Sequence, residues 1–183
     1  MTYTLLPPND PRVLSGIAEF NIDIFKEDEK IELKEFVDNM FETMKKYGGI
    51  GLSANQVGKP YRMFVMGDHP NISKGKKWVC INPKITNVTQ DLIRYKEGCL
   101  TFPFLFLDIE RPQDISVEYL DANLEKKEEH MTGIVARCFQ HEFDHMQGIV
   151  FTEHVSKLKL DMAMKKRDKQ IKRAQKQWQS LKN

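Results

Sequence analysis

Two histidines four residues apart, with a glutamate beside the first, carry the strongest chemical signal in the sequence. They lie in the segment His141-Glu142-Phe143-Asp144-His145. At this spacing both imidazoles project from one face of a helix and can bind a single metal ion, and the glutamate is placed to move protons on a metal-bound water. A solvated polar helix face would show the same pattern, so a third ligand has to distinguish the two interpretations.

The third ligand must come from upstream of this pair. One group of zinc proteases places a third histidine six residues after the second, but that position is Phe151 here, and His154 comes three residues later. Another group uses a glutamate much further downstream, whereas the last glutamate of this chain is Glu153. A zinc endopeptidase built on this motif would therefore lack its third ligand.

Three cysteines could complete the site, and Cys99 is the best candidate. It lies in Glu97-Gly98-Cys99-Leu100-Thr101, where the glycine lets the backbone turn so that a thiolate can point into a pocket. A small buried hydrophobic residue is the alternative for Cys99, and Cys80 fits that description well. Cys138 lies three residues before His141 and stays ambiguous, because a fourth protein ligand would close the position that catalysis needs for water.

A glycine-rich segment, Gly48-Gly49-Ile50-Gly51-Leu52-Ser53-Ala54-Asn55-Gln56, is the third candidate. Its glycines permit close approach of the backbone to a ligand, and the amide of Gln56 can donate a hydrogen bond to an oxyanion. The segment lacks the Gly-Lys-Ser/Thr ending of a phosphate-binding loop. Taken alone, it could also be the exit from a helix.

Hydrophobic periodicity predicts the elements that position these segments. An amphipathic helix is expected over Ile31–Tyr47, a second over Thr132–Gly148 that carries the histidine pair, and a third from Lys157 to about Leu181. Strands are expected over Tyr61–Met66, Trp78–Ile81 and Asp114–Leu120, with turn signals between them that include Asn82-Pro83. We therefore predict an α+β fold, in which short antiparallel strands pack around a central metal-binding helix, with an N-terminal amphipathic helix and a basic C-terminal helix.

Composition narrows the class of protein. With 183 residues, 40% hydrophobic and 30% charged, the chain fits one globular domain and excludes fibrous and fully disordered classes. The sequence shows no apolar run of membrane-helix length and no secretory signal, so we expect no membrane partner. Three scattered cysteines do not make a disulfide framework, which favours a cytoplasmic location.

The three candidate segments, in this order, resemble the motifs of the peptide deformylase family. The motifs correspond to Gly49–Gln56, Glu97–Thr101 and Gln140–Gly148, and the resemblance extends over residues 4–155. The flanking segments Asp10–Leu14, Ile81–Pro83 and Glu110–Pro112 agree as well. The chain departs from the family pattern at Ser53, Thr101 and Met146, where alanine, serine and leucine are usual.

The resemblance implies a hydrolase that removes the formyl group from N-formylmethionine at the start of new polypeptides. It implies one divalent metal ion held by Cys99, His141 and His145, with Fe2+ as the native metal, although ligand chemistry alone also allows Zn2+, Ni2+ or Co2+. Glu142 would be the general base. The matching family positions also place the Gln56 amide and the Leu100 backbone N–H at the oxyanion.

An apolar pocket beside the metal is expected to take the methionine side chain. Ile134 and Cys138 share one helix face with the histidine pair and are predicted to line it. The other wall of the family's pocket matches Gly49, Ile50 and Gly51. The apolar segment Phe102–Leu107 replaces residues that are often polar or basic in the family. We expect it to be a buried strand, while an exposed segment would alter the preference for residues after the methionine or mark a lid or partner contact.

The C-terminal segment is strongly basic, although the net charge of the whole chain is only +2. Residues 156–183 contain ten Lys or Arg and two Asp. A solvated helix explains this, and contact with ribosomal RNA phosphates, as some deformylases are thought to make, is the alternative. We expect a catalytic domain over residues 1–155, followed over residues 156–183 by a helix that is part of it or an appendage. A nucleic-acid- or ribosome-binding module without enzymatic activity is the competing interpretation, besides the endopeptidase.

Overall fold

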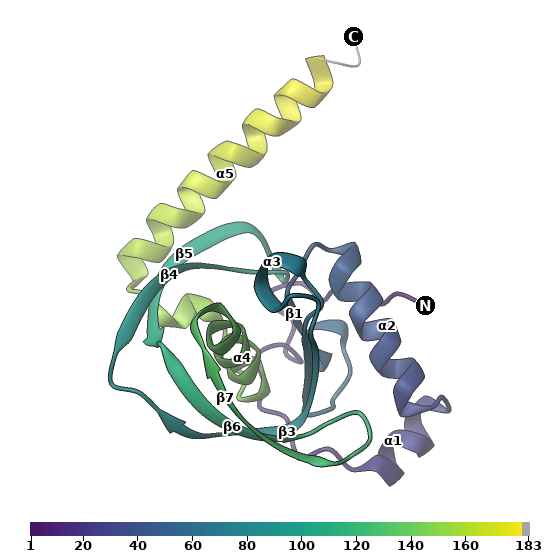
Figure 1. The fold of residues 1–183 in the computed structure, drawn as a ribbon. Helices are drawn as coiled ribbons and strands as arrows, with labels where there is room; N and C mark the ends of the chain where they lie inside the picture. The colour runs from purple at the N-terminus through teal and green to yellow at the C-terminus, as the bar shows by residue number, and fades with distance from the viewer. Residues whose placement is uncertain (181–183) are drawn as a thin grey trace.

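Two antiparallel sheets form the body of the molecule in the computed structural model, which describes residues 1–180 (Figure 1). The larger sheet has the strand order β1-β2-β3-β6-β7. Its strands are β1 (Gly51–Ser53), β2 (Met63–Gly67), β3 (Lys77–Val88), β6 (Asp114–Leu120) and β7 (Lys126–Thr132). The smaller sheet pairs β4 (Leu92–Cys99) with β5 (Phe102–Pro112).

The helices include the three predicted ones in the predicted order and two short ones that were not predicted, and the fold is α+β. They are α1 (Ile22–Glu29), α2 (Leu33–Lys46), α3 (Pro70–Ser73), α4 (Gly133–Met146) and α5 (Lys157–Ser180), with 3-10 turns η1 (Ala54–Val57) and η2 (Phe151–His154). The last residue predicted for the third helix, Leu181, lies outside the described residues. Within residues 1–180, every helix is too short or too polar to span a membrane.

The helix α2 forms because its apolar residues recur at helical spacing. Phe36, Met40 and Met44 are each at most 1% exposed and pack in one core cluster with residues of β1 and β2. The helix stops at Gly48, which adopts a φ of +71° that few other residues tolerate. The chain then enters β1, so the glycine-rich segment is both a helix exit and the start of a sheet.

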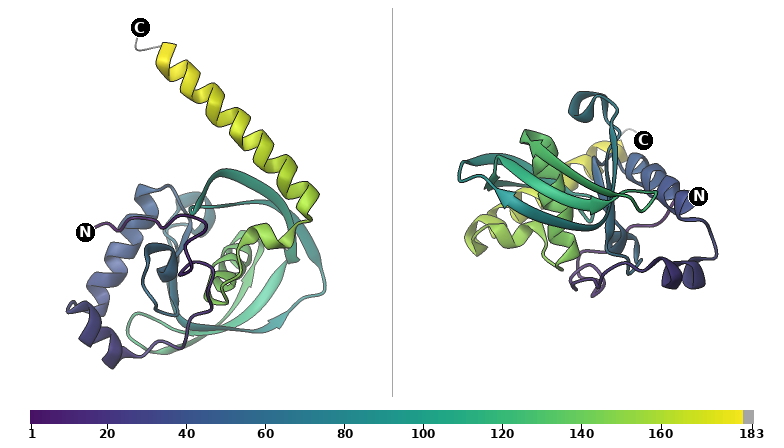
Figure 2. Two further views of the ribbon diagram at one scale, coloured as in Figure 1. Left: turned by 180° about the vertical axis from the view of Figure 1, so that it is seen from behind. Right: turned by 60° about the horizontal axis from the view of Figure 1, so that its bottom comes forward.

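The helix α4 lies in the middle of the molecule, enclosed by strands (Figures 1 and 2). It contacts β1, β2, β6 and β7. Its apolar side, including Ala136, Phe139 and Met146, packs against the inward-facing residues of β6, where Ile115 and Val117 alternate with more exposed neighbours. The predicted helix therefore lies at a central position, and the histidine pair that it carries lies in the interior.

Several strand predictions need correction. The strand expected to end at Asn82-Pro83 runs on to Val88, because a register shift against β6 between Ile81 and Lys84 absorbs the proline. The polar edge strand β7 has no alternating apolar signal, since Met131 is its one buried residue. The segment Phe102–Leu107 is a strand but only half buried, because its alternate side chains face solvent.

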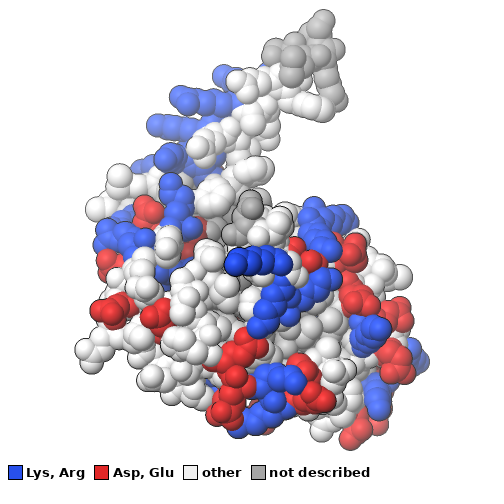
Figure 3. All heavy atoms as spheres, in the orientation of Figure 1, with Lys and Arg blue, Asp and Glu red and all other residues white. Residues whose placement is uncertain are grey.

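The helix α5 projects away from the body (Figure 1), and Lys and Arg side chains follow one side of it (Figure 3). Its first turns are attached differently from the rest. Leu160, Ala163 and Met164 pack against the cluster that contains Cys99 and Leu105. The first turns of α5 therefore contribute to the packing of the body.

Candidate metal centre

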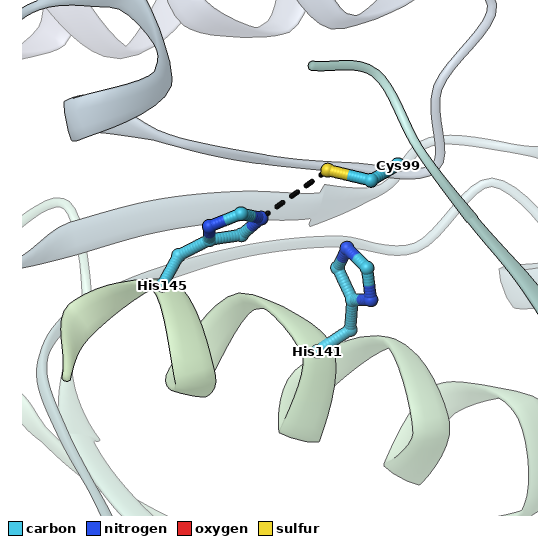
Figure 4. A group of neighbouring side chains, drawn as sticks. All are labelled: Cys99, His141 and His145. Carbon is cyan, nitrogen blue, oxygen red and sulfur yellow. Dashed lines mark hydrogen bonds between the residues drawn. The ribbon is translucent and has the colours of Figure 1, made fainter. Parts of the chain in front are cut away.

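The side chains of Cys99, His141 and His145 point toward one another (Figure 4). One ligand atom from each lies within 4.8 Å of the others. The histidines project from successive turns of α4, and Cys99 ends β4 opposite them, with its Sγ 3.4 Å from Nε2 of His145. A thiolate with two imidazoles is a donor set for Zn2+, Fe2+, Co2+ or Ni2+. The structure thus brings together the three residues that the resemblance implied as ligands.

Electrostatics in this cluster favour a cation. Burial alone would raise the pKa of the Cys99 thiol, but interactions with the neighbouring imidazoles of His145 and His141 hold that pKa well below its ordinary value. Burial would likewise lower the pKa of His141, but Cys99 and Glu97 raise it to about 10. The negative charges of Cys99 and Glu97 therefore stabilise positive charge at this position, and a divalent cation held there would be stabilised in the same way.

Glu97 fixes the first histidine. Its Oε2 lies 3.1 Å from Nδ1 of His141, which leaves Nε2 of that ring to face the site. The carboxylate also receives hydrogen bonds from Arg111 at 2.8 Å and Arg137 at 2.7 Å. Burial would raise the pKa of Glu97, but His141 and Arg111 hold it well below the usual range. Its contribution to stability is therefore complete above the ordinary glutamate pKa and is lost only as the pH falls below that value.

Replacing Glu97 with glutamine is expected to cost about 3 kcal/mol in the free energy of unfolding, because two buried guanidinium groups lose their shared carboxylate. Urea unfolding at pH 7, followed by tryptophan fluorescence, measures this loss. The matched control is Glu110→Gln on the same ribbon, where the partner Arg94 is 60% exposed and the pair should contribute less than about 1 kcal/mol. Equal midpoints for the two variants would contradict the structural role given to Glu97.

Glu142 is buried beside the three candidate ligands and carries an unsatisfied oxygen. It is 4% exposed, and its Oε2 has no hydrogen-bond partner among the described residues. Burial raises its pKa to about 7. A carboxylate with a pKa near neutrality suits proton transfer, because it can both take and return a proton.

Gln56 is held with its amide toward the site. Its Oε1 accepts hydrogen bonds from the backbone N–H and the hydroxyl of Ser53, at 3.0 and 2.9 Å. Its Nε2 donates to Thr101 at 2.9 Å and lies 3.4 Å from Sγ of Cys99. Two departures from the family pattern, Ser53 and Thr101, therefore hold the amide from both ends.

A cavity of about 490 Å3 opens beside the ligands. All the residues predicted to bind substrate line it, together with Leu100, Gln56 and Glu142 from the predicted catalytic set. The predicted substrate-binding residues are Gly49, Ile50, Gly51, Ile134 and Cys138. At Gly51, a Cβ atom would lie 2.3 Å from Oε1 of Glu142, so only glycine allows this strand to approach the carboxylate so closely. Cys138 lines the wall, and its Sγ lies 3.4 Å from the backbone oxygen of Ile50.

Sequence reasoning missed the residues that support the ligands. Arg111, Arg137 and the partly buried Asp144 join Glu97 in one network, and Asp144 also lies 2.7 Å from His154. One signal was present, since Glu97 precedes Cys99 by two residues and a strand places such residues on one side. No spacing rule pairs it with arginines from β5 and α4.

Comparison with known proteins agrees with this geometry. The family model for polypeptide deformylase matches residues 9–161, which include all three motif segments. The peptide deformylase of Wolbachia sp. subsp. Brugia malayi is 42% identical, over 75% of this chain and 82% of that protein, and that of Erythrobacter litoralis is 36% identical, over 88% and 93%. The crystal structure of Ehrlichia chaffeensis peptide deformylase in complex with actinonin is similar with a TM-score of 0.78 and 39% identity, over 92% of this chain and 97% of that one. This chain belongs to the peptide deformylase family.

Proposed function

We propose that this protein is a metal-dependent hydrolase that removes the N-formyl group from formylmethionine at the start of newly made polypeptides. The observation that carries the proposal is the meeting of a cysteine and two histidines with a buried glutamate at the wall of a largely apolar cavity. Membership of the peptide deformylase family supports the same reaction. The cytoplasmic location stays a prediction.

One divalent cation would be held by Cys99, His141 and His145. When bound, it supplies Lewis-acid activation of a water molecule and of the formyl oxygen. We propose Fe2+ as the native ion because the family resemblance implies it, with Zn2+, Ni2+ or Co2+ as substitutes that the same donors accept. A site with three protein ligands also keeps a position open for catalysis.

Glu142 takes the proton of the attacking water and later delivers it to the leaving amine. Its buried position and its raised pKa support this role, and a bound cation would lower that pKa again, so that the base is ionised at neutral pH. The Gln56 amide and the Leu100 backbone N–H donate hydrogen bonds to the formyl oxygen, which becomes an oxyanion when water adds to the formyl carbon. The substrate methionine lies in the part of the cavity lined by Ile50, Ile134 and Cys138.

Formate release from formyl-Met-Ala-Ser by the metal-loaded protein tests the proposal. We expect formate to be released from this tripeptide. In a separate, longer peptide whose two ends are blocked, we expect no cleavage of internal peptide bonds. The reverse result, cleavage inside the chain and no formate, would contradict the proposal and support the endopeptidase alternative.

The basic outer part of α5 is proposed to contact ribosomal RNA phosphates, where the substrate emerges. Truncation after Asp168 keeps Ala163 and Met164 against the body and removes the cations Lys169, Lys172, Arg173, Lys176 and Lys182 from the sequence. Turnover of a short formyl-peptide should then stay within a few-fold. The affinity for ribosomes should fall, and its salt dependence should become shallower by about 0.7–0.9 in log–log slope for each phosphate that the shortened helix no longer neutralises. If the full-length and the truncated protein bound ribosomes equally across a salt series, the proposed phosphate contact would be contradicted, and the outer part of α5 would be only a solvated helix.

A further inference from the structure

Two aromatic side chains of β5 are exposed at the wall of the cavity that contains the metal centre. Phe104 is 66% and Phe106 59% exposed, and both line the cavity together with Cys99 and Glu142. Leu105 lies between them and packs inward, 1% exposed. Two exposed phenylalanines that line one functional cavity differ from single apolar residues scattered over a surface, and apolar areas of this kind mark contact sites.

Phe104 is also strained. Its φ is +63°, in the left-handed region that bulky side chains rarely adopt. The pairing of β4 with β5 explains the strain, because Gly98 pairs with Phe106 while the next residue, Cys99, pairs with Phe102, so residues 103–105 bulge out of the ladder. Burial of the ring does not offset the cost of this conformation, and such uncompensated strain is typical of functional positions.

Phe106 is held in place over the backbone beside a candidate metal ligand. A Cβ atom on Gly98 would lie 2.8 Å from Cε1 of Phe106, so the ring occupies the space that the missing side chain leaves. An aromatic ring that covers a cross-strand glycine is restricted in its motion. The ring is therefore positioned before any ligand binds, which lowers the entropy cost of using it as a contact.

The cavity has room beyond a methionine side chain. Its volume of about 490 Å3 falls among pockets that take drug-sized ligands, and Tyr47 at the end of α2 lines it as well. Lys96 is the one exposed charged side chain in its wall among the described residues, and it would attract an acidic group instead. Two exposed phenylalanines and a single exposed lysine therefore line this part of the cavity, which favours an apolar ligand over an acidic one. Both phenylalanines lie on the strand that follows Cys99.

We propose that Phe104 and Phe106 make the enzyme selective for formyl-Met peptides that carry an apolar side chain at one of the two residues after the methionine. The inference rests on the proposed function and adds a preference within its substrates. An apolar side chain of the substrate that moves from water into contact with the two rings is stabilised by the hydrophobic effect. A polar side chain of the same shape is destabilised there because it gives up hydrogen bonds to water.

Matched peptides measure this preference. Leucine and asparagine are close in shape, so kcat/KM is compared between formyl-Met-Leu-Ser and formyl-Met-Asn-Ser, and between formyl-Met-Ser-Leu and formyl-Met-Ser-Asn. The unmodified, metal-loaded enzyme should favour the leucine peptide about tenfold at one of the two positions. The variants Phe104→Gly and Phe106→Ser should each reduce this ratio at least about threefold.

Phe104→Gly keeps the test independent of folding. Glycine adopts a positive φ without strain and the lost ring is mostly exposed, so the melting temperature should stay equal or rise. The matched control is Leu92→Ser, a 60% exposed apolar residue at the far end of the same ribbon and outside the cavity lining, which should leave the ratio unchanged.

The outcomes separate the two claims. Formate release without discrimination at either position, a preference for the asparagine peptides, or an unchanged ratio in both phenylalanine variants would overturn this inference alone. Failure to release formate from every formyl-Met peptide would overturn the proposed function, and this inference with it.

Discussion

Replacing Glu142 with glutamine is expected to lower the turnover of a formyl-Met peptide by about 10²–10⁴-fold, while the protein keeps its bound cation. The amide has nearly the same shape as the carboxylate and fits the same buried position, but it cannot take a proton. Glu142 is outside the group of Cys99, His141 and His145 that could hold an ion. The loss should therefore appear in kcat and leave the metal content close to that of the unmodified enzyme.

The pH profile provides the control for this variant. In the unmodified enzyme, the rate should rise with pH as Glu142 loses its proton, because only the carboxylate can act as a base. Glutamine has no such titration, so this limb of the profile should disappear. The variant Glu128→Gln, on the exposed strand β7, should keep both the rate and the profile. A metal-loaded Glu142→Gln protein with near-normal turnover would contradict the role proposed for Glu142.

Replacing Cys99 with alanine is expected to weaken metal binding at least about 10²-fold, because one of three donors and its negative charge are removed. The matched control is Cys80→Ala, since Cys80 is 0% exposed, and burial raises the pKa of its thiol well above the ordinary value. That thiol stays protonated, and its replacement should leave the metal content unchanged. Metal analysis after dialysis against a weak chelator measures both variants.

The same thiolate makes the site sensitive to oxygen. Oxidation of Cys99 removes its donor character, and Fe2+ promotes this reaction more than Ni2+ or Co2+ does. Activity with Fe2+ should therefore decline in air, while the Ni2+ form should stay active. Loss of metal from Cys80→Ala but not from Cys99→Ala would contradict the assignment of the ligands.

Local patterns predict the fold where burial follows a regular period. The helix α2 and the strand β6 are recognisable from periodicity because one face of each is buried along its whole length. The strand β7 is not, because six of its seven residues are polar and it lies at a sheet edge. Asn82-Pro83 has the local signature of a turn, and only the pairing of β3 with β6 shows how the strand accommodates it. Such pairing between distant strands cannot be predicted from the local spacing of residue types.

The residues of the site differ in how much the sequence alone can predict about their roles. The spacing of His141 and His145 defines a pair of donors on one helix face without further information. Leu100 can be named only through the family resemblance, since its proposed donor is a backbone N–H that any residue provides. Arg111 is visible in the sequence only as part of a flanking motif, because its partner Glu97 lies on another strand and their pairing depends on strand register.

Titration of the metal-free enzyme with Fe2+ in the absence of oxygen tests most directly whether the Cys99, His141 and His145 centre removes formyl groups. Bound metal and formate release from formyl-Met-Ala-Ser are measured at each addition. We expect the rate to rise in proportion to bound metal and to level off at one ion per chain, and to stay at background in Cys99→Ala protein at the same Fe2+ concentration. Full activity before any metal is added, or no formate release with one ion bound per chain, would contradict this mechanism.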